Sequence, residues 1–246
     1  MSLNLLLPFL STLVMFVFAA YVLQRYYVRR RLPFLFWGLG LAMFGIGSLA
    51  EAMFAFGWND WVFFAWYLFG AVLTAAWIGQ GTVYLLAKKK RAHILTGILI
   101  AASLLAALML LSTMPDLDSS IFTPDEPISE QYRSIMPPIS EGGYVRLTTP
   151  FFNVYGLVTL VGGALWSTFL FWRKRVLPNR VVGNVLIAVG ALTIASASTL
   201  TRLGYGQVLY LGELLAAILM FAGFLVAAAP RPERAGDKST PATTSA

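Results

Sequence analysis

Long apolar runs alternate with short polar segments along most of the chain. A helix needs about 20 consecutive, predominantly apolar residues to cross a bilayer. Seven runs have that length, at about 4–24, 34–56, 61–87, 93–113, 149–172, 181–203 and 207–229. The pattern therefore predicts an all-α integral membrane protein, a seven-transmembrane-helix bundle that forms one domain over residues 1–229.

Two polar segments are longer than a simple turn. The segment 114–148 holds six acidic residues, two arginines and five prolines, so we expect an irregular loop with a short helix near 128–135. A loop of this length is usually a lid, a binding loop or a disordered tether. The polar tail 230–246 has too few apolar residues to pack, and we expect it to be disordered.

The positive charges mark one side of the expected membrane. They cluster at Arg25 with 29–31, at 88–91, at 173–175 with Arg180, and in the tail. Cytoplasmic loops carry an excess of lysine and arginine. Since the clusters fall on alternate connections, we expect the N-terminus and loop 114–148 outside and the C-terminus in the cytoplasm.

Composition excludes several classes of function. Apolar residues make up 58% of the chain and charged residues 12%, compared with about 45–50% and 25% in globular domains. There is no cysteine, and the one histidine, His93, falls at the end of an expected helix. We therefore expect no metal site, no cofactor and no enzyme activity. The basic clusters form no continuous groove for nucleic acid.

The chain also carries a weak internal repeat. Arg30-Arg31-Leu32-Pro33 and Arg175-Val176-Leu177-Pro178 open the second and sixth helices, and glycines follow each proline at the fifth and twelfth positions. Helices one to three would then match helices five to seven, a 3+1+3 parallel repeat. In topology this arrangement resembles the PQ-loop and SWEET transporters and the microbial rhodopsins. However, Pro8 and Pro150 are not followed by glutamine, and no lysine lies in helix seven.

Three ionisable residues lie well inside the expected helices: Glu51, Arg202 and Glu213. At 1.5 Å per residue they share a depth toward the outer side with Tyr67, Asn153 and Tyr210. A carboxylate at that depth usually faces the bundle interior and has a partner. We expect a ligand-binding site for a proton, an ion or a small polar, zwitterionic or amphiphilic molecule. The alternative is a packing salt bridge with Arg202 reaching the interface.

A stripe along the third helix extends the candidate site. Its residues are spaced by three and four, which places them on one face: Tyr67, Gly70, Thr74, Trp77, Gly81 and Tyr84. We expect Trp77 to form the floor of a central cavity, with Gln80 beside it. The competing interpretation is an ordinary helix-packing seam rich in small residues.

Three functions fit these expectations. The first is a sensor or ligand-binding protein of the plasma membrane with an outer-facing polar pocket, signalling through a separate membrane or cytoplasmic partner. The second is a small transporter, proton-coupled or facilitative, built from the two repeats. The third is a structural subunit of a membrane complex. In each case the expected surroundings are the lipid bilayer.

Overall fold

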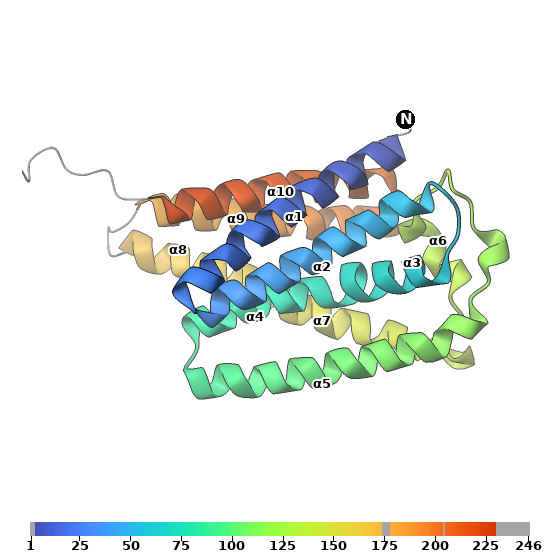
Figure 1. Ribbon diagram of the computed structural model, residues 1–246, viewed down its shortest axis with the longest axis horizontal. Coiled ribbons are helices and arrows are strands. Elements are labelled where there is room, and N and C mark those ends of the chain that lie inside the picture. The colour runs from blue at the N-terminus through green and yellow to red at the C-terminus, as the bar shows by residue number, and fades with distance from the viewer. Residues whose placement is uncertain (1–2, 174–177, 204, 230–246) are drawn as a thin grey trace, which may run out of the picture.

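The structure, a computed structural model, describes residues 3–173, 178–203 and 205–229, with only the backbone for 3–5, 178, 202 and 207. Within this part of the chain every regular element is a helix. Seven helical spans in it are long and apolar enough to cross a membrane. They run side by side in an elongated bundle (Figure 1). The chain therefore has the architecture of an all-α, multi-pass membrane protein.

Five of the described spans are single helices. The first four of these are α1 (Leu3–Arg29), α2 (Leu32–Phe54), α5 (Lys89–Thr113) and α9 (Pro178–Arg202). The last span is α10 (Gln207–Ala228). The first helix continues from the expected end at 24 to Arg29, and the fourth begins at Lys89 instead of 93. Lysine and arginine are good helix formers, so the helices continue into basic turns that an apolar pattern does not include.

The third and fifth spans each contain a π-helical turn. The third is α3 (Asp60–Ala65), the π-helix η1 (Trp66–Leu73) and α4 (Thr74–Leu86). The fifth is the 3₁₀ turn η5 (Tyr144–Leu147), α7 (Thr148–Leu157), the π-helix η6 (Val158–Gly162) and α8 (Gly163–Arg173). Such turns occur often at functional sites, and η1 carries one of the candidate residues, Tyr67.

The loop between α5 and η5 is ordered by short helices. It contains η2 (Met114–Asp116), η3 (Ser119–Ile121), α6 (Ile128–Ile135) and η4 (Ile139–Glu141). The helix expected near 128–135 is thus present as α6. Gln131 fixes its position by bonding the N–H and carbonyl of Thr123, at 2.7 and 2.8 Å, and the carbonyl of Glu126 at 2.7 Å.

The two ends of the bundle differ in charge. One end, called the basic end below, carries 29–31, 88–91, Arg173 and Arg180 at the helix termini. The other end holds α6 and the start of α1 (Figure 1). The tail 230–246 lies outside the described residues, so its expected disorder stays a prediction.

Two apolar clusters form the interior. The cluster toward the α6 end joins α2, α3, η1, α5 and α6 around Phe63 and Tyr67. The other joins α1, α2, α8, α9 and α10 around Met15 and Leu41. Large apolar side chains are also exposed along most of the described spans. A water-soluble surface rarely has such continuous apolar area, which agrees with helices that face lipid.

Glycines allow the central helices to approach closely. A Cβ on Gly47 of α2 would lie 2.6 Å from the Cα of Gly70 in η1, and one on Gly40 would lie 2.7 Å from the backbone nitrogen of Ile78. Small residues are typical of membrane helix interfaces because they let backbones meet. The crossing of α2 over η1 and α4 brings the next turn of α2, with Glu51, against Trp66.

Candidate functional site

Two carboxyl groups meet inside the bundle, between α2 and α10. Glu51 is 4% exposed and Glu213 is 8% exposed, and their carboxyl groups lie close together. Two hydrogen-bond donors approach the pair. Trp66 Nε1 donates to Glu51 Oε1 at 2.9 Å, and Ser48 Oγ lies 3.4 Å from Glu213 Oε2. We call Glu51, Glu213, Ser48 and Trp66 the carboxyl site.

The carboxyl site has more acceptors than fixed donors. The second oxygen of Glu51, Oε2, is buried and has no fixed donor among the described groups. No described lysine or arginine forms an ion pair with either glutamate or acts on its charge. Two ionised carboxylates in contact repel strongly in an apolar interior. Among the described groups no cation neutralises this pair, and a proton on one carboxyl would satisfy the free oxygen of the other.

Local sequence explains how the site is assembled. Ser48 and Glu51 are three residues apart, so they lie on one face of α2. Asn59 caps α3 by accepting hydrogen bonds from the backbone N–H groups of Trp61 and Val62, at 2.9 and 3.2 Å. This cap fixes the start of the third span, which carries Trp66. Trp66 then lies under α6, where its ring packs 5.6 Å from that of Tyr132.

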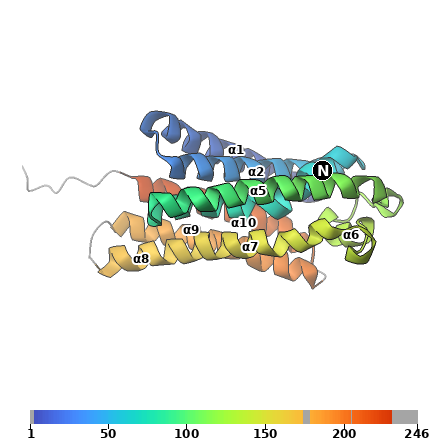
Figure 2. The same cartoon turned by 90° about the horizontal axis from the view of Figure 1, so that it is seen from below.

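Helix α6 covers the carboxyl site at its end of the bundle. The Tyr210 hydroxyl lies close to the backbone of Ile128 at the start of α6, and close to both glutamates. In the connection between α9 and α10, the backbone of Gly206 lies directly against the side chain of Glu130. Figure 2 shows α6 beside the end of α7. Tyr210 is thus both a wall of the site and a contact for its cover.

Tyr67 and Asn153 make other contacts. The Tyr67 hydroxyl bonds Thr149 Oγ1 of α7 at 3.1 Å, and its ring packs against Phe63 and Tyr132. Asn153 Nδ2 donates to the carbonyl of Ala71, inside η1, at 3.2 Å. Both side chains therefore join the third span to α7.

Trp77 and Gln80 bond to the helices beside α4. Trp77 Nε1 donates to Ser103 Oγ of α5 at 3.2 Å, and its ring stacks on Phe36 at 5.7 Å. Gln80 Nε2 donates to Thr96 Oγ1 at 2.8 Å and to the carbonyl of Ala92 at 3.0 Å. Its Oε1 accepts from the Tyr155 hydroxyl of α7. In these contacts the stripe on α4 acts as a packing seam.

Replacing Gln80 with leucine is expected to destabilise the bundle. The change removes three hydrogen bonds that join α4 to α5 and α7, at a cost of about 1–2 kcal/mol in a membrane interior. Thermal unfolding in detergent, followed by circular dichroism, measures the loss. Gln24→Leu is the matched control because Gln24 is exposed. Equal unfolding midpoints for the two variants would contradict a structural role for Gln80.

The structure thus brings Glu51, Glu213 and Tyr210 together. Arg202 ends α9, but its side chain lies outside the described residues, so its expected role stays a prediction. Sequence reasoning did not find Ser48, Trp66 or the α6 contacts. The spacing of three between Ser48 and Glu51 was an available signal. The sequence carried no signal for Trp66, because the direction of its side chain depends on the π-helical turn.

Comparisons with known proteins give no further identification. No family model matches the chain, and no curated protein or solved structure shows significant similarity to it.

Proposed function

We propose that this protein is a membrane sensor whose input is protonation of the Glu51–Glu213 pair beneath α6. One observation carries the proposal: two buried carboxyl groups close together, with an unpartnered oxygen and no described cation beside them. A proton can bind at such a site because it needs no cavity. An amine or zwitterionic ligand would bring the same positive charge but would also need space.

The orientation is part of the proposal. By the positive-inside rule we assign the basic end to the cytoplasm, which puts the N-terminus and α6 outside. The carboxyl site then lies toward the outer face, under a cover that faces the medium. We assign the protein to the plasma membrane because most of its loops are short and the chain is compact.

Signal transfer would begin with the contact between α2 and α10. One shared proton lets the carboxyl groups bond each other, whereas its loss leaves two like charges in contact, which pushes the helices apart. Because α10 extends from the site to the basic end, its displacement would reach the cytoplasmic face. A separate signalling partner bound there would read the change.

Infrared spectroscopy tests the proposal directly. A protonated carboxyl shows a C=O stretching band that an ionised one lacks. We expect wild-type protein in lipid nanodiscs to keep such a band at neutral pH, each of Glu51→Gln and Glu213→Gln to shift it, and the double variant to lose it. Glu141→Gln is the matched control, since Glu141 is exposed on the loop. A wild-type spectrum without this band at neutral pH would refute a shared proton.

A proton-coupled transporter is the second candidate. It would use the same carboxyl pair and the proposed 3+1+3 repeat, and it would require the site to open to each side in turn. Vesicles loaded with a pH-sensitive dye distinguish the two functions. Proton uptake that depends on Glu213 would favour transport, and an infrared response without net uptake would favour sensing.

A further inference from the structure

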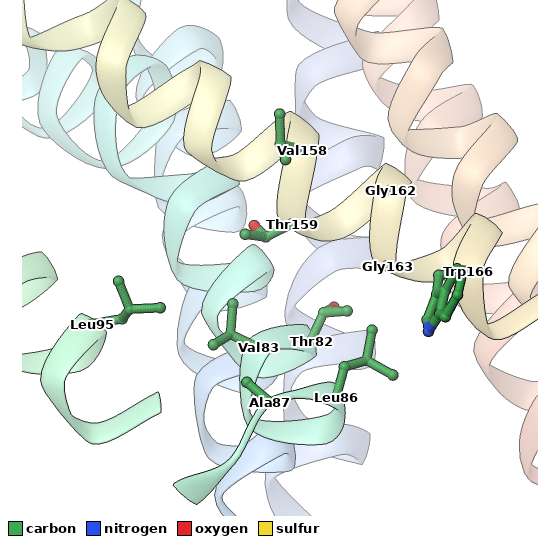
Figure 3. Close-up of a pocket in the computed structure, with 10 residues that line it drawn as sticks. All are labelled: Thr82, Val83, Leu86, Ala87, Leu95, Val158, Thr159, Gly162, Gly163 and Trp166. Atoms are coloured by element: carbon green, nitrogen blue, oxygen red, sulfur yellow. The ribbon is translucent and has the colours of Figure 1, made fainter. Parts of the chain in front are cut away.

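A second candidate site lies between α4, α5 and the fifth span, far from the carboxyl pair in sequence and in place. It is a groove of about 380 Å³, within the range of small-molecule sites. Its floor is formed by α4 and its walls by α5 and by η6 with α8 (Figure 3). The lining residues include Leu86, Leu95, Val158, Gly162 and Trp166.

The groove is chemically apolar, although two threonines line it. Thr82 Oγ1 accepts a hydrogen bond from Trp37 Nε1 at 3.4 Å, and Thr159 Oγ1 donates to the carbonyl of Tyr155 at 2.6 Å. Both hydroxyls are therefore already engaged within the protein. What remains is a surface of aliphatic and aromatic groups, which suits a hydrocarbon chain better than a polar ligand.

Protein packing does not fill the groove. A Cβ on Gly162 would meet nothing within 4 Å, whereas a Cβ on Gly163 would touch Thr82. Gly163 is thus needed for helix contact, and Gly162 leaves open space on the groove side. Helix α5 packs only loosely at this groove. Its apolar segment is the least buried inside the protein among the described spans.

Positive charge surrounds the groove where it reaches the basic end. Ala87 lines the groove and is followed directly by the four cations 88–91. On the opposite wall, Arg173 follows Trp166 by seven residues, so it lies on the same face of α8 two turns farther on. Among the described side chains, these five cations form no ion pair. They are free to bind an anion.

We propose that this groove binds one anionic phospholipid, with an acyl chain between α5 and η6–α8 and the phosphate at residues 88–91 and Arg173. Basic pockets between membrane helices are known to hold anionic headgroups. An apolar groove that opens to lipid along its length and ends in cations has the polarity of such a molecule. The bound lipid would fill the space between α5 and η6–α8 and so hold the loosely packed α5 in place.

Native mass spectrometry tests this with an equal mixture of phosphatidylglycerol and phosphatidylcholine that carry the same chains. We expect the wild type to retain phosphatidylglycerol over phosphatidylcholine by about fivefold or more, the preference that one cation near the headgroup supplies. Gly162→Phe fills the groove and should abolish the retention. Gly97→Phe is the control, since Gly97 also has open space but lies outside the groove.

Charge variants test the headgroup separately. Neutralising 88–91 to glutamine should lower the preference for phosphatidylglycerol, leaving only the contribution of Arg173, and neutralising 29–31, a turn of three arginines outside the groove, should leave the preference unchanged. These exposed positions tolerate the change, so the test holds even if Gly162→Phe fails to fold. Equal retention of both lipids by the wild type, or unchanged retention in the 88–91 variant, overturns the proposal. So does a change of oligomeric state in Gly162→Phe with unchanged lipid retention, which would make the groove a subunit interface.

Discussion

Replacing Gly47 with leucine is expected to cost about 3 kcal/mol or more of unfolding free energy, at the upper end of overpacking effects. The new Cβ would lie 2.6 Å from the Cα of Gly70. A backbone atom cannot rotate away as a side chain can, so α2 and η1 must separate. Glu51 lies one turn farther along α2, and its hydrogen bond from Trp66 should lengthen or break.

The matched control is Gly97→Leu. Both positions are glycines in the interior of membrane helices, but a Cβ on Gly97 meets nothing within 4 Å. Helix propensity alone would make leucine slightly favourable there. Unfolding in increasing dodecyl sulfate, followed by circular dichroism, compares the two. If Gly47→Leu unfolds at the same detergent fraction as Gly97→Leu, the α2–η1 approach is not a determinant of stability.

Locking α6 in place is expected to slow proton exchange at the carboxyl site. A Cβ on Gly206 would lie 2.6 Å from Cγ of Glu130, and one carbon–carbon bond adds at most about 1.5 Å. The Cβ atoms of a Glu130→Cys, Gly206→Cys pair therefore fall within reach of a disulfide, whose Cβ atoms lie about 3.5–4.5 Å apart. The chain has no other cysteine, so the pairing is unambiguous.

Time-resolved infrared spectroscopy after a pH jump measures the effect. In the reduced protein we expect α6 to open locally, so that protons exchange. In the oxidised protein this opening is blocked, and we expect the response of the carboxyl band to slow by about tenfold or more. A reducing agent should restore the rate, and each single cysteine variant should resemble the reduced form. Equal rates in the oxidised and reduced proteins would mean that protons reach the site by another route.

The all-α, seven-span architecture could be predicted from the sequence alone. Bilayer thickness sets the minimum length of an apolar helix, and backbone groups in lipid must bond within their own segment. Length and polarity therefore identify the spans without any knowledge of tertiary contacts. The burial of Glu51 and Glu213 followed from the same reasoning, because a lipid-facing carboxylate is costly.

Tertiary structure decided which of the polar residues meet. Shared depth grouped Tyr67, Asn153 and Tyr210 with the glutamates, but depth fixes only the position along the membrane normal. The direction of each side chain depends on helix rotation. In the third span the π-helical turn of η1 sets that rotation: it directs Trp66 to Glu51 and Tyr67 to Thr149.

Packing also decided the role of the stripe on the third helix and of the long loop. Regular spacing shows that residues share a face, but it cannot show whether the face meets a cavity or a neighbouring helix. Trp77 and Gln80 meet α5 and α7. Likewise, the sequence predicted a short helix in the loop, but only the contacts of Tyr132 and Glu130 placed it over the carboxyl site. Both outcomes depend on which surfaces come together, and a one-dimensional pattern does not contain that information.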